Sequence, residues 1–101
     1  MQNLTSATFQ EFTKKPAALV DVWATWCGPC QMQGKALEQL TAAHPELAEK
    51  IGKVNVDDER DLAVQFGINA IPALLFFQNG KLVKSLIGLQ SDATILALFQ
   101  E

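Results

Sequence analysis

The sequence predicts an α/β protein in three layers: a mixed five-stranded β-sheet flanked by four helices. Short apolar segments of strand length alternate along the chain with helix-forming segments, a pattern typical of a sheet covered on both faces. The segment from Ala17 to Ala24 is apolar on both faces apart from one Asp, so we expect a central strand there. Asn79-Gly80 indicates a tight hairpin, which makes the strands around it antiparallel.

The chain is expected to begin with a short extended segment and a short helix. Thr5 or Ser6 can cap this helix, in which Phe9 and Phe12 share one face, and Lys14-Lys15-Pro16 ends it.

The central strand directs successive side chains to opposite faces of the sheet. Leu19, Asp21 and Trp23 are therefore expected on one face, and Val20 and Val22 on the other. Asp21 is the only charged residue of this strand.

A long helix begins at the motif Trp26-Cys27-Gly28-Pro29-Cys30. It ends at His44-Pro45, because the residue before a proline is pushed out of the helical region. Its apolar residues recur at helical spacing, at Ala36, Leu37, Leu40 and Ala43.

The second half of the chain is expected to add three strands and two helices. These are a strand from Ile51 to Asp57, a helix that stops at Gly67, a strand from Ala73 to Phe77, a return strand from Leu82 to Ile87, and a last helix capped by Ser91. Asp57 or Asp58 can cap the first of the two helices. A right-handed crossover makes the strands at 19–23 and 51–57 parallel, and the same rule favours a parallel strand at 73–77.

Composition limits the classes of function. The chain has 101 residues and a net charge of −3, so we expect a single domain over residues 1–101 with no nucleic-acid partner. No apolar stretch reaches the roughly 18 residues of a membrane span, and no signal peptide is visible. We therefore expect a cytoplasmic monomer without membrane contact, in a reducing compartment where a Cys-x-x-Cys pair is catalytic or metal-binding.

Cys27 and Cys30 are the only cysteines, and they lie where a strand gives way to a helix. Disulfide exchange needs a thiolate, which the N–H groups and the dipole at a helix N-terminus favour. Cys27 lies at that point and is the predicted nucleophile; Cys30, one turn further on the same face, can resolve a mixed disulfide. Gly28 allows the tight turn, Pro29 fits the first helical turn, and Trp26 gives the reactive sulfur an apolar neighbour.

Two other interpretations of the pair are weaker. A zinc site needs four ligands, whereas the chain has no second cysteine pair and a single histidine, His44, so we expect no metal. A purely structural disulfide that closes so small a loop would stabilise little, because the unfolded chain loses little entropy.

The segment from Leu19 to Cys30 resembles the active-site segment of the thioredoxin family. The resemblance extends to Lys53-Val54-Asn55-Val56-Asp57, to Phe66-Gly67-Ile68-Asn69-Ala70-Ile71-Pro72 and to Phe77-Gln78-Asn79-Gly80, so it covers essentially the whole chain in order. It implies the thioredoxin fold. It also implies that the strand at 73–77 is antiparallel to its neighbours, which we adopt over the crossover rule.

The resemblance implies a role for each residue of the redox centre. Cys27 attacks a protein disulfide, and Cys30 then attacks the mixed disulfide, which leaves a Cys27–Cys30 disulfide. Asp21 corresponds to a buried carboxylate that handles the proton of the resolving cysteine, and Lys53 to a lysine near that carboxylate. A buried, unpaired carboxylate tends to stay protonated, which suits a general acid or base. A structural Asp21 and a solvated Lys53 are the alternatives.

The resemblance also implies a substrate groove. Pro72 matches a proline that is cis in the family, and Ile71 would pair through its backbone with an extended substrate segment. The implied apolar rim consists of Trp26, Gly28, Pro29, Ile71, Pro72 and Gly88. Trp23 is expected to pack in the core near the site.

Four residues depart from the family pattern. Gln31 replaces a common basic residue, Lys35 a helix-kinking proline, Ala73 a threonine and Leu89 an alanine. None affects the thiol chemistry, so these departures bear on substrate preference and on the bend of the helix.

The sequence therefore predicts a general protein-disulfide reductase with no bound cofactor. The resemblance implies that electrons come from NADPH through a thioredoxin reductase, and that substrates include ribonucleotide reductase, peroxiredoxins and methionine sulfoxide reductases. One alternative is a disulfide oxidase or isomerase; Gly28-Pro29 argues against it, because oxidising relatives usually carry a histidine between the cysteines. The other is a thioredoxin-fold binding or assembly module.

Overall fold

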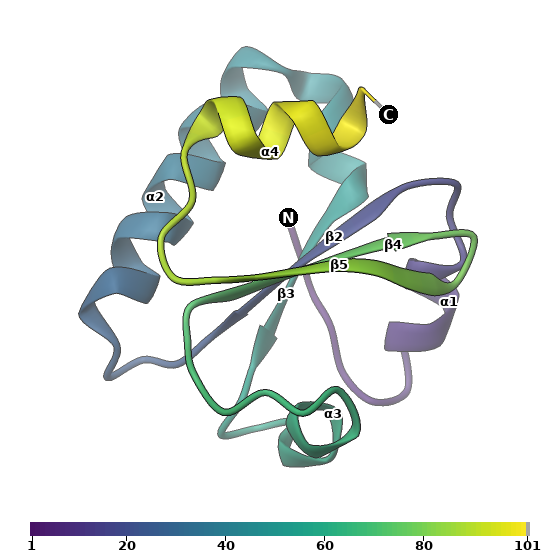
Figure 1. The fold of residues 1–101 in the computed structure, drawn as a ribbon, viewed down its shortest axis with the longest axis vertical. Helices are drawn as coiled ribbons and strands as arrows, with labels where there is room; N and C mark the ends of the chain where they lie inside the picture. Colours follow the sequence, from purple (N-terminus) through teal and green to yellow (C-terminus); the bar gives the residue numbers. More distant parts are fainter. Residues whose placement is uncertain (101) are drawn as a thin grey trace.

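The computed structural model describes residues 1–100, in which one sheet is covered by helices on both faces (Figure 1). The elements, in chain order, are β1 (Gln2–Asn3), α1 (Phe9–Thr13), β2 (Ala18–Trp23), α2 (Gly28–Ala43), the 3-10 helix η1 (Pro45–Lys50), β3 (Ile51–Asn55), α3 (Arg60–Gln65), β4 (Ala73–Gln78), β5 (Lys81–Ile87) and α4 (Asp92–Phe99). No helix within residues 1–100 is long and apolar enough to cross a membrane.

The sheet has five strands in the order β1-β3-β2-β4-β5. β3 pairs in parallel with β1 and with β2, whereas β4 is antiparallel to both β2 and β5. The mixed sheet implied by the family resemblance is thus confirmed, and the crossover rule was wrong for β4. After β3 the connection that contains the six-residue α3 returns the chain to the end of the sheet where β3 finishes, so β4 runs opposite to β2.

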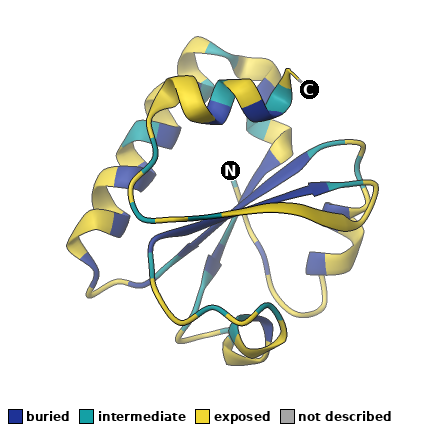
Figure 2. Ribbon diagram, in the orientation of Figure 1, coloured by how far each residue is buried: buried dark blue, intermediate teal, exposed yellow. Residues whose placement is uncertain are grey.

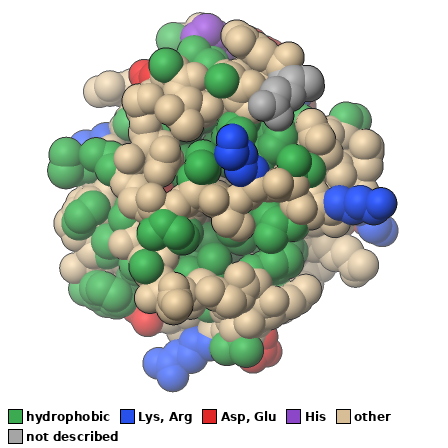
Figure 3. All heavy atoms as spheres, in the orientation of Figure 1, with side chains coloured by type: hydrophobic (Ala, Val, Ile, Leu, Met, Phe, Trp, Pro, Cys, Tyr) green, Lys and Arg blue, Asp and Glu red, His purple; other side chains and the backbone are tan. Residues whose placement is uncertain are grey.

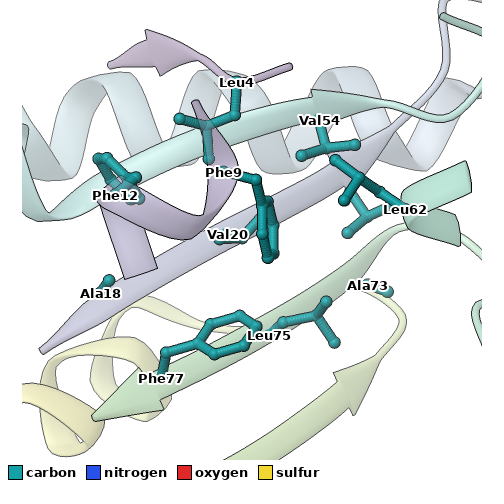
Figure 4. Packing of buried hydrophobic residues seen from close by; sticks show 11 residues of the cluster. Leu4, Phe9, Phe12, Ala18, Val20, Val54, Leu62, Ala73, Leu75 and Phe77 are labelled. Atoms are coloured by element: carbon teal, nitrogen blue, oxygen red, sulfur yellow. The ribbon is translucent and has the colours of Figure 1, made fainter. Parts of the chain in front are cut away.

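Two apolar layers enclose the sheet. α1 and α3 cover one face, and α2 and α4 cover the other (Figure 1). Val20 and Val22 point into the layer under α1 and α3, which Figure 4 shows from close by, and Leu19 points into the layer under α2 and α4. The predicted alternation along β2 is therefore confirmed. Figure 2 shows the result: the central strands are buried, and β5 at the edge is largely exposed.

The turns are those that the sequence predicted. Asn79 and Gly80 both have positive φ, 54° and 87°, and they connect β4 to β5 as a two-residue hairpin loop. Gly67, with φ of 64°, follows the end of α3, and the Ser91 side chain accepts a hydrogen bond from Thr94 N at the start of α4.

Both other predicted helix caps are wrong. α1 follows Thr8, and the carbonyl of Thr5, rather than its side chain, accepts the N–H of Phe9. α3 follows Glu59 without a side-chain cap, and the Asp57 carboxylate instead accepts a hydrogen bond from Trp26. The strand predicted to run to Asp57 ends at Asn55, and η1 was not predicted.

Candidate active site

The two cysteines lie at the N-terminus of α2. Cys27 is the N-cap residue, and its sulfur accepts a hydrogen bond from Cys30 N at 3.2 Å, as a capping oxygen does in most helices. A disulfide joins Cys27 to Cys30, whose Cα atoms are 5.2 Å apart. Cys27 is the more exposed residue of the two, at 7% against 2%.

The turn around the disulfide is shaped by its neighbours. Gly28 and Pro29 form the first two positions of α2 and are exposed. Trp26 is 69% exposed, and its indole Nε1 donates to Asp57 Oδ2 at 2.8 Å. This bond holds a large apolar ring beside the cysteines.

Asp21 lies in the central strand and is fully buried. Within residues 1–100, neither of its carboxylate oxygens has a hydrogen-bond partner. Burial raises the pKa of Asp21 from 3.8 to about 7, against the opposing effect of the Lys53 charge. At neutral pH this carboxyl group can therefore both bind and release a proton.

Lys53 lies directly across from Asp21 in the parallel pair of β2 and β3. Its Nζ lies 4.6 Å from the centre of the Trp23 ring, and a Cβ on Gly34 of α2 would lie 3.8 Å from it. The Lys53 ammonium thus lies in the space between the sheet and α2. Among the described residues it forms no ion pair with Asp21 within 4 Å, which is why burial determines the direction of the Asp21 pKa.

Trp23 packs against the cluster that contains the two cysteines. It is half-buried and lies with Ala24, Val56 and Ile71 around the sulfurs, as its predicted core role requires.

Ile71 and Pro72 immediately precede β4, at the end of the sheet where the cysteines lie. The bond between them is cis, and Ile71 packs against the two cysteines. Gly88 follows β5 with φ of 88°, and its N–H donates to Pro72 O at 2.8 Å. Three separate segments therefore meet around the disulfide: the start of α2, the residues before β4 and the residues after β5.

The surface beside the disulfide is apolar. A hollow of about 180 Å³ is lined by Trp26, Val56, Ala63, Ile68, Asn69, Ala70 and Ile71. Leu82, Val83 and Ile87 on β5, and Leu89 after it, are further exposed apolar residues. Figure 3 shows hydrophobic side chains over much of the face that β5 crosses, with a basic side chain near its middle and most other charged side chains toward its outline. A larger hollow along α1 contains none of the predicted site residues.

One buried polar residue at the site was not predicted. Gln33 of α2 is fully buried, and its side chain binds the backbone of Gln90. The signal was present in the sequence: Gln33 lies one turn after Cys30 and one turn before Leu37, on the face of the helix that must pack on the sheet.

This arrangement defines a protein that exchanges thiols and disulfides. The cysteine sulfurs can cycle between a disulfide and two thiols, and a Cys27 thiolate would be stabilised by the N–H groups at the helix start.

Comparison with known proteins agrees with this class. The model of the Thioredoxin family matches residues 1–101. The thioredoxin of Alicyclobacillus acidocaldarius is 46% identical over 89 residues, which cover 86% of this chain and 83% of that protein. The structure of the thioredoxin of Malassezia sympodialis superposes with a TM-score of 0.83 at 31% identity, over 98% of this chain and 90% of the other.

A third relative comes from a structural study of thiol resolution in a yeast mitochondrial 1-Cys peroxiredoxin by glutathione and thioredoxin systems. It has a TM-score of 0.84 at 26% identity, over 100% of this chain and 95% of the other. The chain belongs to the thioredoxin family, and it is a thiol–disulfide oxidoreductase with a redox-active Cys-x-x-Cys disulfide.

Proposed function

We propose that this protein is a general protein-disulfide reductase in which Cys27 is the nucleophile and Cys30 the resolving residue. The observation that supports this assignment most directly is the position of Cys27, whose sulfur caps α2 and which is the more exposed residue of the pair. The Cys27 thiolate attacks a substrate disulfide, which forms a mixed disulfide and releases one substrate thiolate. The Cys30 thiolate then attacks the Cys27 sulfur. The substrate leaves with two thiols, and two electrons have passed to it from the cysteine pair.

In this proposal Asp21 moves the proton of the resolving step. Cys30 must lose its proton before it can attack, and the raised pKa of Asp21 gives a carboxylate that can take up that proton near pH 7. Lys53 keeps the Asp21 pKa from rising further, because its charge favours the ionised carboxylate.

The proposed substrate groove lies between Trp26 and the segment before β4. Gly28 and Pro29 would lie on its rim beside the sulfurs, and Gly88 would lie on the rim next to Pro72, to which its N–H is bonded. An extended substrate segment would pair with the backbone of Ile71 as an added strand, with apolar side chains against the hollow next to Trp26.

The proposed partners follow from the family. A peroxiredoxin is one proposed substrate, which the similarity to the chain from the yeast peroxiredoxin study supports. Ribonucleotide reductase and methionine sulfoxide reductases are the other proposed substrate types. An NADPH-dependent thioredoxin reductase would return the pair to the dithiol form. We further propose that residues 1–101 act as one domain in the cytoplasm, where thiols are kept reduced.

The reduction potential of the Cys27–Cys30 pair, measured by thiol trapping in dithiothreitol buffers, tests the direction of electron flow. We expect a value at the reducing end of the range of Cys-x-x-Cys proteins. A value at the oxidising end would replace the reductase with an oxidase or isomerase.

Two variants test the roles of the sulfurs. Cys27→Ser should abolish insulin reduction, whereas Cys30→Ser should trap mixed disulfides that appear as slower bands on a non-reducing gel. Reductase activity in Cys27→Ser, or no mixed disulfide in Cys30→Ser under excess substrate, would overturn the assignment.

A further inference from the structure

Gln33 is the buried polar residue of α2 that the exchange chemistry does not use. It lies one helical turn after Cys30, and its side chain is completely removed from solvent. The other buried residues of the same helix face further along, Leu37 and Leu40, pack in the apolar layer under α4. A buried amide in that position costs free energy unless its polar atoms are satisfied, so its hydrogen bonds indicate what the residue does.

Both polar atoms of the Gln33 side chain bind one residue, Gln90, in the segment between β5 and α4. Gln33 Oε1 accepts from Gln90 N at 2.7 Å, and Gln33 Nε2 donates to Gln90 O at 3.3 Å. The amide therefore pairs with the backbone of this segment as a neighbouring strand would, and it joins α2 to a part of the chain 57 residues away.

The hydrogen bonds continue from Gln90 to the groove. The Gln90 side chain donates to Ile87 O at 3.1 Å and to Gly88 O at 3.3 Å. These two bonds link the end of the turn to its beginning. Gly88 N in turn donates to Pro72 O. A continuous series of bonds thus connects the helix that carries the cysteines to the turn after β5 and to the residues before β4.

The turn has little else to hold it. Gly88 has φ of 88°, and no described side chain or backbone atom beyond its neighbours would lie within 4 Å of a Cβ built there. Leu89 is 49% exposed. A segment with so few apolar contacts is expected to move unless its backbone bonds fix it.

We infer that Gln33 is a positioning residue that fixes the turn from Gly88 to Gln90 and thereby sets the width of the groove for extended protein segments. This inference rests on the proposed function, because it assigns the groove to polypeptide substrates. A small disulfide needs access only to the Cys27 sulfur, whereas a polypeptide must also fit against the turn. Gln33 therefore favours protein disulfides over small ones.

The substitution that tests this is Gln33→Met, which keeps the length of the side chain and removes both hydrogen bonds. We expect KM for insulin disulfides to rise by about three- to tenfold, because the freed turn must be ordered when the substrate binds, with a much smaller change in kcat. The ratio of kcat/KM for insulin to that for the small disulfide 5,5′-dithiobis(2-nitrobenzoate) should fall by the same factor.

Two control variants separate positioning from stability. Gln39→Met makes the same chemical change at an exposed position of α2. Leu40→Ala destabilises the apolar layer under α4 without touching Gln90. Neither should change the ratio of the two kcat/KM values. If Leu40→Ala lowers the ratio as much as Gln33→Met does, or if Gln33→Met leaves it unchanged, Gln33 has no positioning role.

Hydrogen exchange on the wild-type protein is a second measurement that needs no variant to fold. The Gln90 amide should exchange about tenfold or more slowly than that of its neighbour Leu89, because it is bonded to a buried acceptor. Equal exchange at the two amides would overturn the inference. A wild-type protein that reduces neither disulfide would instead refute the proposed function, so the two failures are distinguishable.

Discussion

Replacing Asp21 by asparagine should make the stability of the protein less dependent on pH. Asp21 is fully buried and its pKa is raised from 3.8 in the unfolded chain to about 7 in the folded one. Between these two values the folded protein holds a proton that the unfolded chain has lost. The free energy of unfolding of the wild type therefore falls as the pH rises through this window.

The size of the effect follows from the separation of the two pKa values. Each unit of pKa difference corresponds to about 1.4 kcal/mol, so ionisation of Asp21 costs the folded state about 4 kcal/mol at pH values above 7. Asparagine has the same shape and does not ionise. The difference in unfolding free energy between Asp21→Asn and the wild type should be constant below pH 4, grow between pH 4 and 7, and level off above that, in favour of the variant.

Urea unfolding of the oxidised proteins at pH 4, 5.5, 7 and 8.5, followed by tryptophan fluorescence, measures this difference. Any constant offset reports the packing of the amide and does not bear on the reasoning. A difference that stays the same over the whole range would show that Asp21 is not desolvated in the folded protein, and it would remove the physical basis of its proposed role in proton transfer.

Two further substitutions test the surroundings of β3. Lys53→Met removes the charge that lowers the Asp21 pKa in the folded protein, so the upper end of the pH window should move to higher pH, whereas its lower end, set by the unfolded chain, should stay near pH 4. Lys53→Arg keeps the charge and should leave the upper end near its wild-type position. An unmoved upper end in Lys53→Met would mean that the lysine does not act on Asp21. Gly52→Ala should destabilise the protein by about 1–3 kcal/mol in urea unfolding, because the new Cβ would lie 2.7 Å from Leu4 Cδ1 and 3.1 Å from Phe12 Cε2. Gly34→Ala is the matched control, since its Cβ would meet only Lys53 Nζ at 3.8 Å, and equal losses in the two variants would contradict the packing explanation.

The parts of the fold that the sequence predicted are those set by local chemistry. Asn79-Gly80 specified its turn because only residues that tolerate positive φ fit it, and Ser91 specified the start of α4 through its hydroxyl. The alternation along β2 placed Asp21 and Trp23 on the α2 side because the period of a strand is fixed. In each case a few neighbouring residues determine the local structure.

The parts that it missed depend on contacts between distant residues. Asp57 is a good capping residue, but Trp26, 31 positions earlier, binds its carboxylate. The direction of β4 depends on the end of the sheet to which the connection after β3 returns the chain, which no residue of β4 encodes. Gln33 and Gln90 meet only because α2 packs across the sheet beside the turn after β5. Each of these contacts joins residues that are far apart in the sequence. A local sequence pattern therefore contains only one of the two partners and cannot predict the contact.

Asp21 and Gln33 show why the active site requires polar groups that the core would otherwise reject. A leucine at either position would bring no polar group that must be satisfied and no charge that must be desolvated. Asp21 instead destabilises the folded protein at each pH at which it is ionised. A group with a pKa near 7 can both accept and return a proton at neutral pH. Lys53 limits that cost without removing it, because a close ion pair would hold the carboxylate charged and end its exchange of protons. The stability lost on ionisation and the proposed proton transfer thus have the same physical origin, and a variant that recovers the first should lose the second.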